Sequence, residues 1–495
     1  MSESFVLSID QGTTGTRAIL YGRMGALKSS AYQEFRQYYP KPGWVEHDAH
    51  EILRSVKNII SEVFRKSGVR PAQIQSIGIT NQRETIVLWD RFSGNAVAKS
   101  IVWQDRRTSD LCAQLKREGL EPEFSQKTGL LLDPYFSGTK LSWFFDRHSA
   151  VRKKAQKGNV LFGTIDSWLL YHLTGKRVHA TDLSNASRTL LFDIKKKKWD
   201  RELCRILKTP LNCVPEAKKS NSFFGKTKDF PPLPDGIPIH AVMGDQQAAL
   251  YGQSCYRAGD SKNTYGTGCF LLVNLGSRFV RSKFGLLTTL ACDQHGNPVY
   301  ALEGSIFIGG AAIQWLRDGL KWIQSAKETE AIAKKTASND EVVVIPAFTG
   351  LGAPYWRPDV RGAILGITRG TTREMIIKAT VDSIALQVND VLQVMTREAG
   401  VKIPALKVDG GATQNRYLMQ LQSDLLRVPV LKSNLTESTA WGVAKLAGYA
   451  SGFWPNLDRL DRSVQYDTFR PKMSLSARNQ TIGHWKQAIQ KLISC

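Results

Sequence analysis

Residues 5–24, FVLSIDQGTTGTRAILYGRM, place two apolar runs on either side of a Gly- and Thr-rich segment. Apolar and β-branched runs interrupted in this way predict two strands joined by a polar hairpin. The same order of strand, polar turn and strand recurs in DSKNTYGTGCFLLVNLG, residues 260–276. Because the second copy begins about half a chain after the first, we predict two related domains, comprising residues 1–254 and 255–495.

Strands and helices alternate around these hairpins. The segment 49–68, AHEILRSVKNIISEVFRKSG, repeats apolar residues at steps of three and four, as does the longer segment 371–400. This spacing predicts helices with one apolar face. The short runs EVVVIPAF (341–348) and ALKVDGG (405–411) predict buried strands. We therefore expect an α/β protein throughout.

The composition is that of an ordinary globular protein, with 42% hydrophobic and 22% charged residues in a chain of 495. No segment reaches the roughly 18 apolar residues of a membrane-spanning helix, and the first residues do not resemble a leader. We expect neither secretion nor membrane insertion, and a cytoplasmic location. The seven cysteines include no C-x-x-C pair, which favours reduced thiols over a zinc site or a disulfide framework.

The formal net charge of +23 is the unusual global feature. Such an excess is compatible with a polyanionic partner such as nucleic acid. Much of the local density lies between Lys195 and Lys228, where no aromatic residues recur at the regular spacing of a stacking surface. We interpret the excess as a solvated basic surface and expect no nucleic-acid partner.

The first hairpin has the chemistry of a phosphate site. Residues 11–17, QGTTGTR, combine backbone N–H groups of tight Gly turns with Thr hydroxyls and one cation. Asp10 precedes them at a strand end, where a carboxylate can hold Mg²⁺ through water. An ordinary β-turn would explain one such hairpin, but the second, Gly266-Thr267-Gly268, allows two copies to grip one polyphosphate.

Two common nucleotide motifs are absent from the sequence. The segment SNSFFGKT (220–227) approaches the phosphate-loop pattern but has Ser220 in place of the first glycine. No G-x-G-x-x-G fingerprint is present, which argues against a dinucleotide oxidoreductase.

The segment IPIHAVMGDQQAALYGQ (237–253) delivers Asp245 from an apolar strand to the start of a helix. We predict Asp245 as the general base of phosphoryl transfer to an alcohol, although helix N-capping alone also explains an Asp here. The Gly-rich segment VDGGATQN (408–415) fits either an adenosine site or a tight turn. Gly309-Gly310 before a helix has the same two interpretations, with Gln314 facing the nucleotide in the first.

Five further motifs complete an ordered set: WVEHD (44–48), ITNQRET (79–85), VWQDRRT (102–108), DPYFSGTKLSW (133–143) and GAPYWRPDVRG (352–362). With these motifs the chain resembles the glycerol kinases, within the carbohydrate kinase family built on the ribonuclease H-like, actin-type ATPase fold. The resemblance covers nearly the whole chain, from Asp10 to Trp454. It implies two such domains with a cleft between them, ATP and Mg²⁺ as cofactors, and glycerol as the substrate.

The resemblance also implies the site residues. Predicted glycerol contacts are Arg83, Glu84, Tyr135, Asp245 and Gln246, with Trp103 and Phe270 as apolar walls. Predicted nucleotide contacts are Thr13, Thr14, Gly15, Arg17, Thr267, Gly310, Gln314, Gly411 and Asn415, and predicted metal contacts are Asp10 and Asp245. Without the ordered match, a solvated pair on a hairpin would explain Arg83 and Glu84, and core packing would explain Trp103 and Tyr135.

The chain departs from the family at two places. Position 15 is Gly where many relatives carry Ser, so only its backbone N–H can serve the nucleotide. The segment KTKDFPPLPDG (226–236) lacks both the sugar-bisphosphate loop and the phosphorylatable His of some bacterial relatives, so we expect neither control. We also expect a homo-oligomer, either a dimer or a tetramer.

Two alternatives stay open. A kinase for xylulose, gluconate or another polyol would share the ATP motifs but differ around residues 83, 84, 103 and 135. A noncatalytic or chaperone-like ATPase of the same fold would need no hydroxyl acceptor site, and therefore no Asp245.

Overall fold

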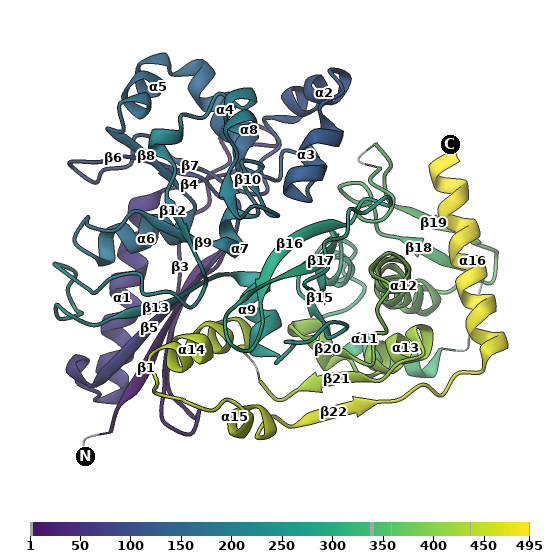
Figure 1. Ribbon diagram of the computed structural model, residues 1–495. Coiled ribbons are helices and arrows are strands. Elements are labelled where there is room, and N and C mark those ends of the chain that lie inside the picture. The colour runs from purple at the N-terminus through teal and green to yellow at the C-terminus, as the bar shows by residue number, and fades with distance from the viewer. Residues whose placement is uncertain (1–2, 337–340, 358, 436, 495) are drawn as a thin grey trace.

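The computed structural model describes residues 3–336, 341–357, 359–435 and 437–494. Its two large sheets lie side by side, each flanked by helices (Figure 1). The first sheet has the strand order β13-β5-β1-β2-β3. Its strands are β1 (Phe5–Gln11), β2 (Gly15–Tyr21), β3 (Leu27–Glu34), β5 (Ile74–Asn81) and β13 (Ile239–Gly244).

The second sheet has the order β16-β17-β15-β14-β20-β21-β22. Its strands are β14 (Ser261–Tyr265), β15 (Cys269–Gly276), β16 (Leu287–Cys292), β17 (Pro298–Ile306), β20 (Leu406–Asp409), β21 (Val430–Ser433) and β22 (Tyr466–Phe469). Each sheet has a polar hairpin joining two antiparallel strands, β1–β2 and β14–β15. In each, the first hairpin strand also pairs in parallel with a later strand, β5 or β20. The repeated order predicted from the two hairpins is therefore confirmed.

The remaining helices and strands of the first half lie outside its large sheet, and the short strands form separate two-stranded sheets. They are α1 (Ala49–Ser67), α2 (Ser109–Arg117), α3 (Glu121–Thr128), α4 (Ser137–Arg147), α5 (Ser149–Gln156), α6 (Ile165–Leu173), α7 (Leu183–Ala186), α8 (Arg201–Ile206) and α9 (Asp245–Gly252), with the short strands β4 (Glu46–His47), β6 (Val87–Asp90), β7 (Ser100–Ile101), β8 (Val160–Gly163), β9 (Ala180–Asp182), β10 (Phe192–Asp193), β11 (Lys198–Trp199) and β12 (Glu216–Lys218).

The second half adds a further set of helices and one small sheet. They are α10 (Gly310–Gln314), α11 (Glu328–Lys335), α12 (Arg373–Ala399), α13 (Arg416–Leu426), α14 (Ser438–Ala450), α15 (Asp458–Arg462) and α16 (Leu475–Ser494), with the strands β18 (Val343–Ile345) and β19 (Ala363–Leu365). The expected alternation of helices and strands is confirmed in both halves.

Both faces of the first sheet are covered, which explains its nearly continuous apolar strands. Phe5, Leu7 and Ile9 of β1 pack with α1 and α6 on one face. Val6 points to the opposite face, where it packs with helix α14 from the far end of the chain. Helix α14 contacts β1, β5, β13 and α9 (Figure 1). The chain therefore crosses back onto its first sheet, and the domain boundary at residue 254 stays a prediction.

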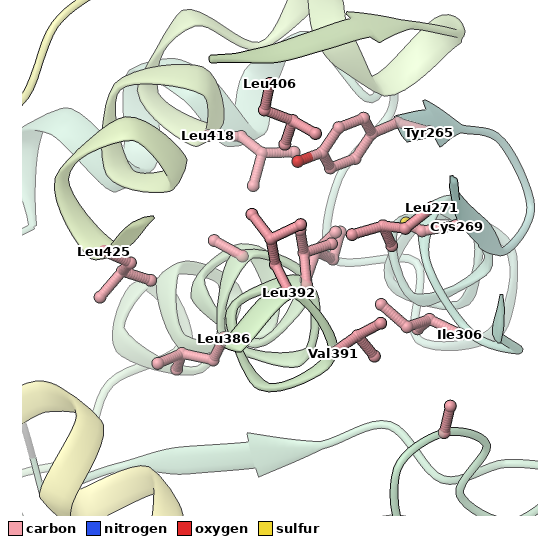
Figure 2. Packing of buried hydrophobic residues seen from close by; sticks show 14 of the residues in the cluster. Tyr265, Cys269, Leu271, Ile306, Leu386, Val391, Leu392, Leu406, Leu418 and Leu425 are labelled. Atoms are coloured by element: carbon pink, nitrogen blue, oxygen red, sulfur yellow. The ribbon is translucent and has the colours of Figure 1, made fainter. Parts of the chain in front are cut away.

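Successive side chains in the strands of the second sheet point to opposite faces of the sheet. Tyr265, Cys269 and Leu271 pack into a core with helices α12 and α13, where Leu386 and Leu418 meet them (Figure 2). The alternate residues of β14, β15 and β17 point to the other face, toward the first half of the chain. Those alternate residues form part of the site.

The six cysteines among the described residues are all free and buried, as the sequence predicted; Cys495 lies outside the described part of the chain. Within the described ranges, no helix has both the length and the apolar character needed to cross a membrane.

Candidate functional site

The first hairpin displays its charged groups in one row across the sheet. Asp10 on β1 pairs with Arg17 on β2, and Arg17 pairs with Tyr32 on β3. Paired residues of neighbouring strands point to the same face. The turn between the strands closes through a 2.9 Å hydrogen bond from the Gly12 N–H to the Gly15 carbonyl.

Asp10 lies in an environment suited to a cation. Burial raises its pKa to about 7; Arg17 lowers it, while Asp245 and Glu437 raise it further. No group of three or more His, Cys, Asp or Glu able to hold a metal occurs among the described residues. Asp10 and Asp245 lie close enough for the charge of Asp245 to raise the pKa of Asp10, and Mg²⁺ usually keeps several waters and binds through one or two such carboxylates. Both residues stay predicted metal contacts.

Arg17 has a partner that the sequence did not predict. Its guanidinium forms an ion pair with Glu437, which directly precedes α14, and lies 5.1 Å from the Tyr32 ring centroid. Glu437 follows Arg17 by 420 residues, so no local pattern could have revealed the contact. A phosphate that binds Arg17 has to share this cation with Glu437.

Arg83 and Glu84 follow β5 and are almost fully buried, at 2% and 1% exposure. The alternative of a solvated hairpin pair is therefore wrong. Glu84 has a left-handed backbone with φ of 63°, a costly conformation for a residue with a side chain. Its carbonyl accepts a 2.9 Å hydrogen bond from the Ser137 hydroxyl, which helps to hold this turn.

Two further buried charges surround this pair. Glu303 accepts hydrogen bonds of 2.6 and 3.0 Å from Arg83 and one of 3.0 Å from Arg188. Arg188 also donates a 2.6 Å hydrogen bond to Glu84. Burial raises the pKa of Glu303, but the attraction of Arg188 and Arg83 outweighs burial and holds that pKa at about 2. Glu303 is therefore ionised.

Asp245 is the first residue of α9, and Gly244 is the N-cap, so N-capping does not account for Asp245. Its Oδ1 atom accepts a 2.7 Å hydrogen bond from the Gln246 N–H and lies 3.2 Å from the Arg83 Nε. These contacts orient one carboxylate oxygen. No hydrogen bond among the described residues involves the other oxygen, Oδ2.

Lys262 is buried on β14 beside Gln246. Its ammonium donates to the Gln246 side-chain oxygen and, at 2.9 Å, to the Thr264 hydroxyl. Burial lowers the Lys262 pKa to about 8, opposed by Asp409, Asp245 and Glu303. Lys262 thus orients the Gln246 amide through its oxygen, and no hydrogen bond among the described residues involves the amide N–H₂.

The predicted apolar walls come together from both halves of the chain. The ring centroid of Trp103 lies 5.5 Å from that of Tyr135 and 6.4 Å from that of Phe270 on β15. The Trp103 indole N–H also donates a 2.9 Å hydrogen bond to the Thr13 hydroxyl of the first hairpin. The predicted substrate and nucleotide residues are thus in direct contact here.

A cavity of about 780 Å³ opens in the second half. Five predicted nucleotide contacts line it: Thr267, Gly310, Gln314, Gly411 and Asn415. The second hairpin borders the cavity through Thr267. The N–H groups of Gly309 and Gly310 donate 2.8 Å hydrogen bonds to hairpin carbonyls and so join the start of α10 to this hairpin. The predicted contacts of the first hairpin, Thr13, Thr14, Gly15 and Arg17, do not line it.

Asn415 is held at the cavity wall in one orientation. Its side-chain oxygen accepts a 2.9 Å hydrogen bond from the Leu418 N–H and caps α13, while its N–H₂ donates at 3.1 Å to Thr329. The second N–H of this amide is the atom available to a nucleotide.

Sequence reasoning missed Arg188, Glu303, Lys262 and Glu437. Glu303 offered one usable signal, since it stands inside the apolar strand run VYALEGSIF (299–307). A carboxylate in such a strand is buried and needs a charged partner. The partners themselves lie too far along the chain for any pattern to identify them.

Comparison with protein families matches residues 5–252 to the N-terminal domain, and residues 261–451 to the C-terminal domain, of the FGGY family of carbohydrate kinases. A glycerol kinase from Bacillus velezensis is 51% identical over 488 residues, covering 98% of this chain and 98% of its own. A glycerol kinase from Bacillus subtilis is 50% identical over 489 residues, covering 99% of each chain.

Solved structures agree with these matches. The glycerol kinase of Plasmodium falciparum, solved with ADP, has a TM-score of 0.93 at 36% identity and covers 99% of this chain and 98% of its own. A xylulose kinase from Lactobacillus acidophilus has a TM-score of 0.88 at 20% identity, covers 99% of each chain, and shows the fold alone. The expected pair of ribonuclease H-like, actin-type ATPase domains is confirmed.

Proposed function

Because this chain belongs to the FGGY family of carbohydrate kinases, we propose that it is a glycerol kinase that transfers the γ-phosphoryl group of ATP to glycerol and forms sn-glycerol 3-phosphate. The observation that carries the proposal is a buried acceptor site. It combines the carboxylate of Asp245 with the Arg83–Glu84 pair and the aromatic walls of Trp103 and Phe270. A triol needs such a mixture of donors, acceptors and apolar surface.

Asp245 is the general base of this reaction. Arg83 and the Gln246 N–H hold its Oδ1 atom, and its Oδ2 atom takes the proton from the terminal hydroxyl of glycerol as that oxygen attacks phosphorus. Glu84 accepts a hydrogen bond from a second hydroxyl, while the carbon chain lies against Trp103 and Phe270. Phosphoryl transfer depends mainly on such positioning and on neutralising charge.

The nucleotide lies in the 780 Å³ cavity of the second half, with its phosphates directed toward the first hairpin. Backbone N–H groups of the two hairpins and the Arg17 guanidinium bind the phosphate oxygens. Asp10 and Asp245 would hold a hydrated Mg²⁺, which would neutralise charge on the transferring phosphate. Burial of Arg83 and Glu84 excludes water from the acceptor site, which limits wasteful hydrolysis of ATP.

A kinase for another polyol or sugar is the principal alternative, because the gluconate and xylulose kinases share the fold at 20–21% identity. Glycerol is favoured by relatives at 50–51% identity and by the aromatic contact between Trp103 and Phe270, which narrows the acceptor site. A noncatalytic ATPase would not need Asp245 and its oriented carboxylate. We further propose a cytoplasmic location, a dimer or tetramer, and no control by sugar bisphosphates or His phosphorylation.

The test is ADP release measured with a panel of acceptors. We expect rapid ADP formation from Mg·ATP with glycerol, and slow formation with xylulose, gluconate or no acceptor. Hydrolysis that does not depend on glycerol, or a higher kcat/KM for a pentulose, would contradict the proposal.

A further inference from the structure

We propose that Glu303 and Arg188 are positioning residues that orient the glycerol-binding pair Arg83 and Glu84, an inference that rests on the proposed function. The four side chains form a closed ring of alternating charge. Glu303 binds Arg83 through two hydrogen bonds of 2.6 and 3.0 Å and Arg188 through one of 3.0 Å. Arg188 binds Glu84 at 2.6 Å, and Arg83 closes the ring 3.7 Å from Glu84.

Arg83 and Glu84 form the inner pair, which faces the acceptor site, and Glu303 and Arg188 form the outer pair, which contacts the inner pair. Glu303 grips the two terminal nitrogens of Arg83 in a fork-to-fork geometry, which fixes the plane of the guanidinium. Arg188 occupies only the Oε1 atom of Glu84, so the Oε2 atom is left for a substrate hydroxyl. The terminal nitrogens of Arg83 also donate to the Gln247 side-chain oxygen at 3.2 Å and to the Tyr135 hydroxyl at 3.4 Å, and its Nε lies 3.2 Å from Asp245. Glu303 and Arg188 therefore fix the plane of Arg83 and determine which oxygen of Glu84 faces glycerol.

Burial makes this ring rigid. Arg188 and Glu303 are 0% exposed, and Arg83 and Glu84 are 2% and 1% exposed. A buried ion that loses its partner is strongly destabilised, because water cannot replace the lost contact. Each member is thus confined to the geometry of its neighbours, and a flexible surface pair would not impose such confinement.

Glu303 brings the second half of the chain into the acceptor site. It lies opposite Leu272 in the β15–β17 ladder, and Ser305, two residues later, lies opposite Phe270. Because side chains two residues apart share a face of a sheet, Glu303 and Phe270 project from the same face. One sheet face therefore supplies both an apolar wall and the residue that orients Arg83.

The experiment compares Glu303→Gln, Arg188→Met and the double variant in the full-length protein. The intact ring is neutral, the single variants leave a net charge of one sign or the other, and the double variant is neutral again. We measure glycerol KM, kcat and ATP KM by ADP release, ADP affinity by calorimetry, and Tm. Asp390→Asn is the matched control, since Asp390 is buried and hydrogen-bonded to Trp485 and Tyr355 outside the acceptor site.

We expect both single variants to raise glycerol KM at least about tenfold, equivalent to about 1.4 kcal/mol, with ATP KM and ADP affinity unchanged. The double variant should recover Tm relative to the single variants while glycerol KM stays raised. Wild-type glycerol KM in the double variant or in Glu303→Gln would overturn the proposal, because the outer pair would then serve only to balance charge. Asp390→Asn should lower Tm without changing glycerol KM. Failure of the wild-type protein to phosphorylate glycerol would instead refute the proposed function.

Discussion

The indole N–H of Trp103 donates a hydrogen bond of 2.9 Å to the hydroxyl of Thr13. Trp103 forms part of the apolar wall of the acceptor site, where its ring faces Tyr135 and Phe270. Thr13 belongs to the first Gly- and Thr-rich hairpin, which we propose to bind phosphate. A single hydrogen bond therefore joins the proposed glycerol wall to the proposed phosphate site.

Trp103→Phe retains an aromatic wall but removes this hydrogen bond. We expect ATP KM to rise severalfold, because the loss of a neutral hydrogen bond costs about 1 kcal/mol and leaves the Thr13 side chain free to rotate. Thr13→Val is the matched change on the other side. In a double-mutant cycle on kcat/KM for ATP, we expect a coupling energy of roughly 0.5–1.5 kcal/mol. Strictly additive effects would show that the contact does not join the two sites.

Asp245→Asn retains the shape of the proposed general base but cannot accept the proton. We expect kcat to fall roughly 10²- to 10⁴-fold, which is the usual contribution of general base catalysis. Binding of ADP should be unchanged in calorimetry, since the described cavity does not include Asp245. Retention of most of the turnover would exclude Asp245 as the base.

Lys262→Met tests the buried ammonium. Burial lowers the pKa of Lys262 from 10.5 to about 8, and the positive charge of Arg83 lowers it further. The carboxylates of Asp409, Asp245 and Glu303 act in the opposite direction and raise it. Between these two pH values the unfolded chain binds more protons than the folded chain, so stability rises with pH. We expect the free energy of unfolding of the wild type, relative to Lys262→Met, to increase from about pH 8 to about pH 10 in denaturant titrations.

The same variant has a kinetic consequence. Without Lys262, the side-chain amide of Gln246 is free to rotate and exchange the positions of its oxygen and N–H₂. We therefore expect glycerol KM to rise while ADP affinity is retained. Lys378→Met is a suitable control, because this lysine pairs with Asp382 on α12 and lies outside the acceptor site. A stability difference that is independent of pH would contradict the burial of a charged amine.

Gly15→Ser introduces a side chain where Tyr32 already lies. A Cβ atom at Gly15 would stand 2.5 Å from the ring and hydroxyl of Tyr32, so the ring has to move. Movement of the ring also removes its contact with the Arg17 guanidinium, worth about 0.5–1 kcal/mol at an exposed site. We expect a modest fall in Tm for Gly15→Ser and no further fall when Tyr32→Ala is combined with it. Equal falls in Tm from Gly15→Ser in both backgrounds would show that the two residues do not compete for space.

Gly410→Ala and Gly411→Ala form a matched pair beside the nucleotide cavity. Gly410 has φ of 94° and its Cβ would lie 2.4 Å from the Tyr265 carbonyl, whereas nothing lies within 4 Å of a Cβ at Gly411. We expect Gly410→Ala to lower stability by more than about 1 kcal/mol. Gly411→Ala should fold normally but weaken ADP binding, because its methyl group enters the cavity. A normal ADP affinity for Gly411→Ala would place the nucleotide elsewhere.

The elements that depend on local pattern were predictable. The two hairpins, helix α1 and the turn before α13 follow from the spacing of apolar residues and from Gly-rich breaks, which act over a few residues. Thr267, Gly310 and Asn415, which line the cavity, were predicted only from the ordered family match, since each residue alone has a simpler explanation. The packing of α14 against β1 was not predictable, because a helix with an apolar face does not specify which sheet will cover it.

The sequence by itself determined the two-domain α/β organisation, the pair of Gly- and Thr-rich hairpins and Asp245 at the start of a helix. The tertiary structure alone decided which charged side chains meet. Arg83 and Glu303 are 220 residues apart in the chain, and Arg17 and Glu437 are 420 residues apart. Strand and turn preferences are local, whereas a buried ion takes whichever opposite charge the packing of two sheets brings within hydrogen-bonding distance.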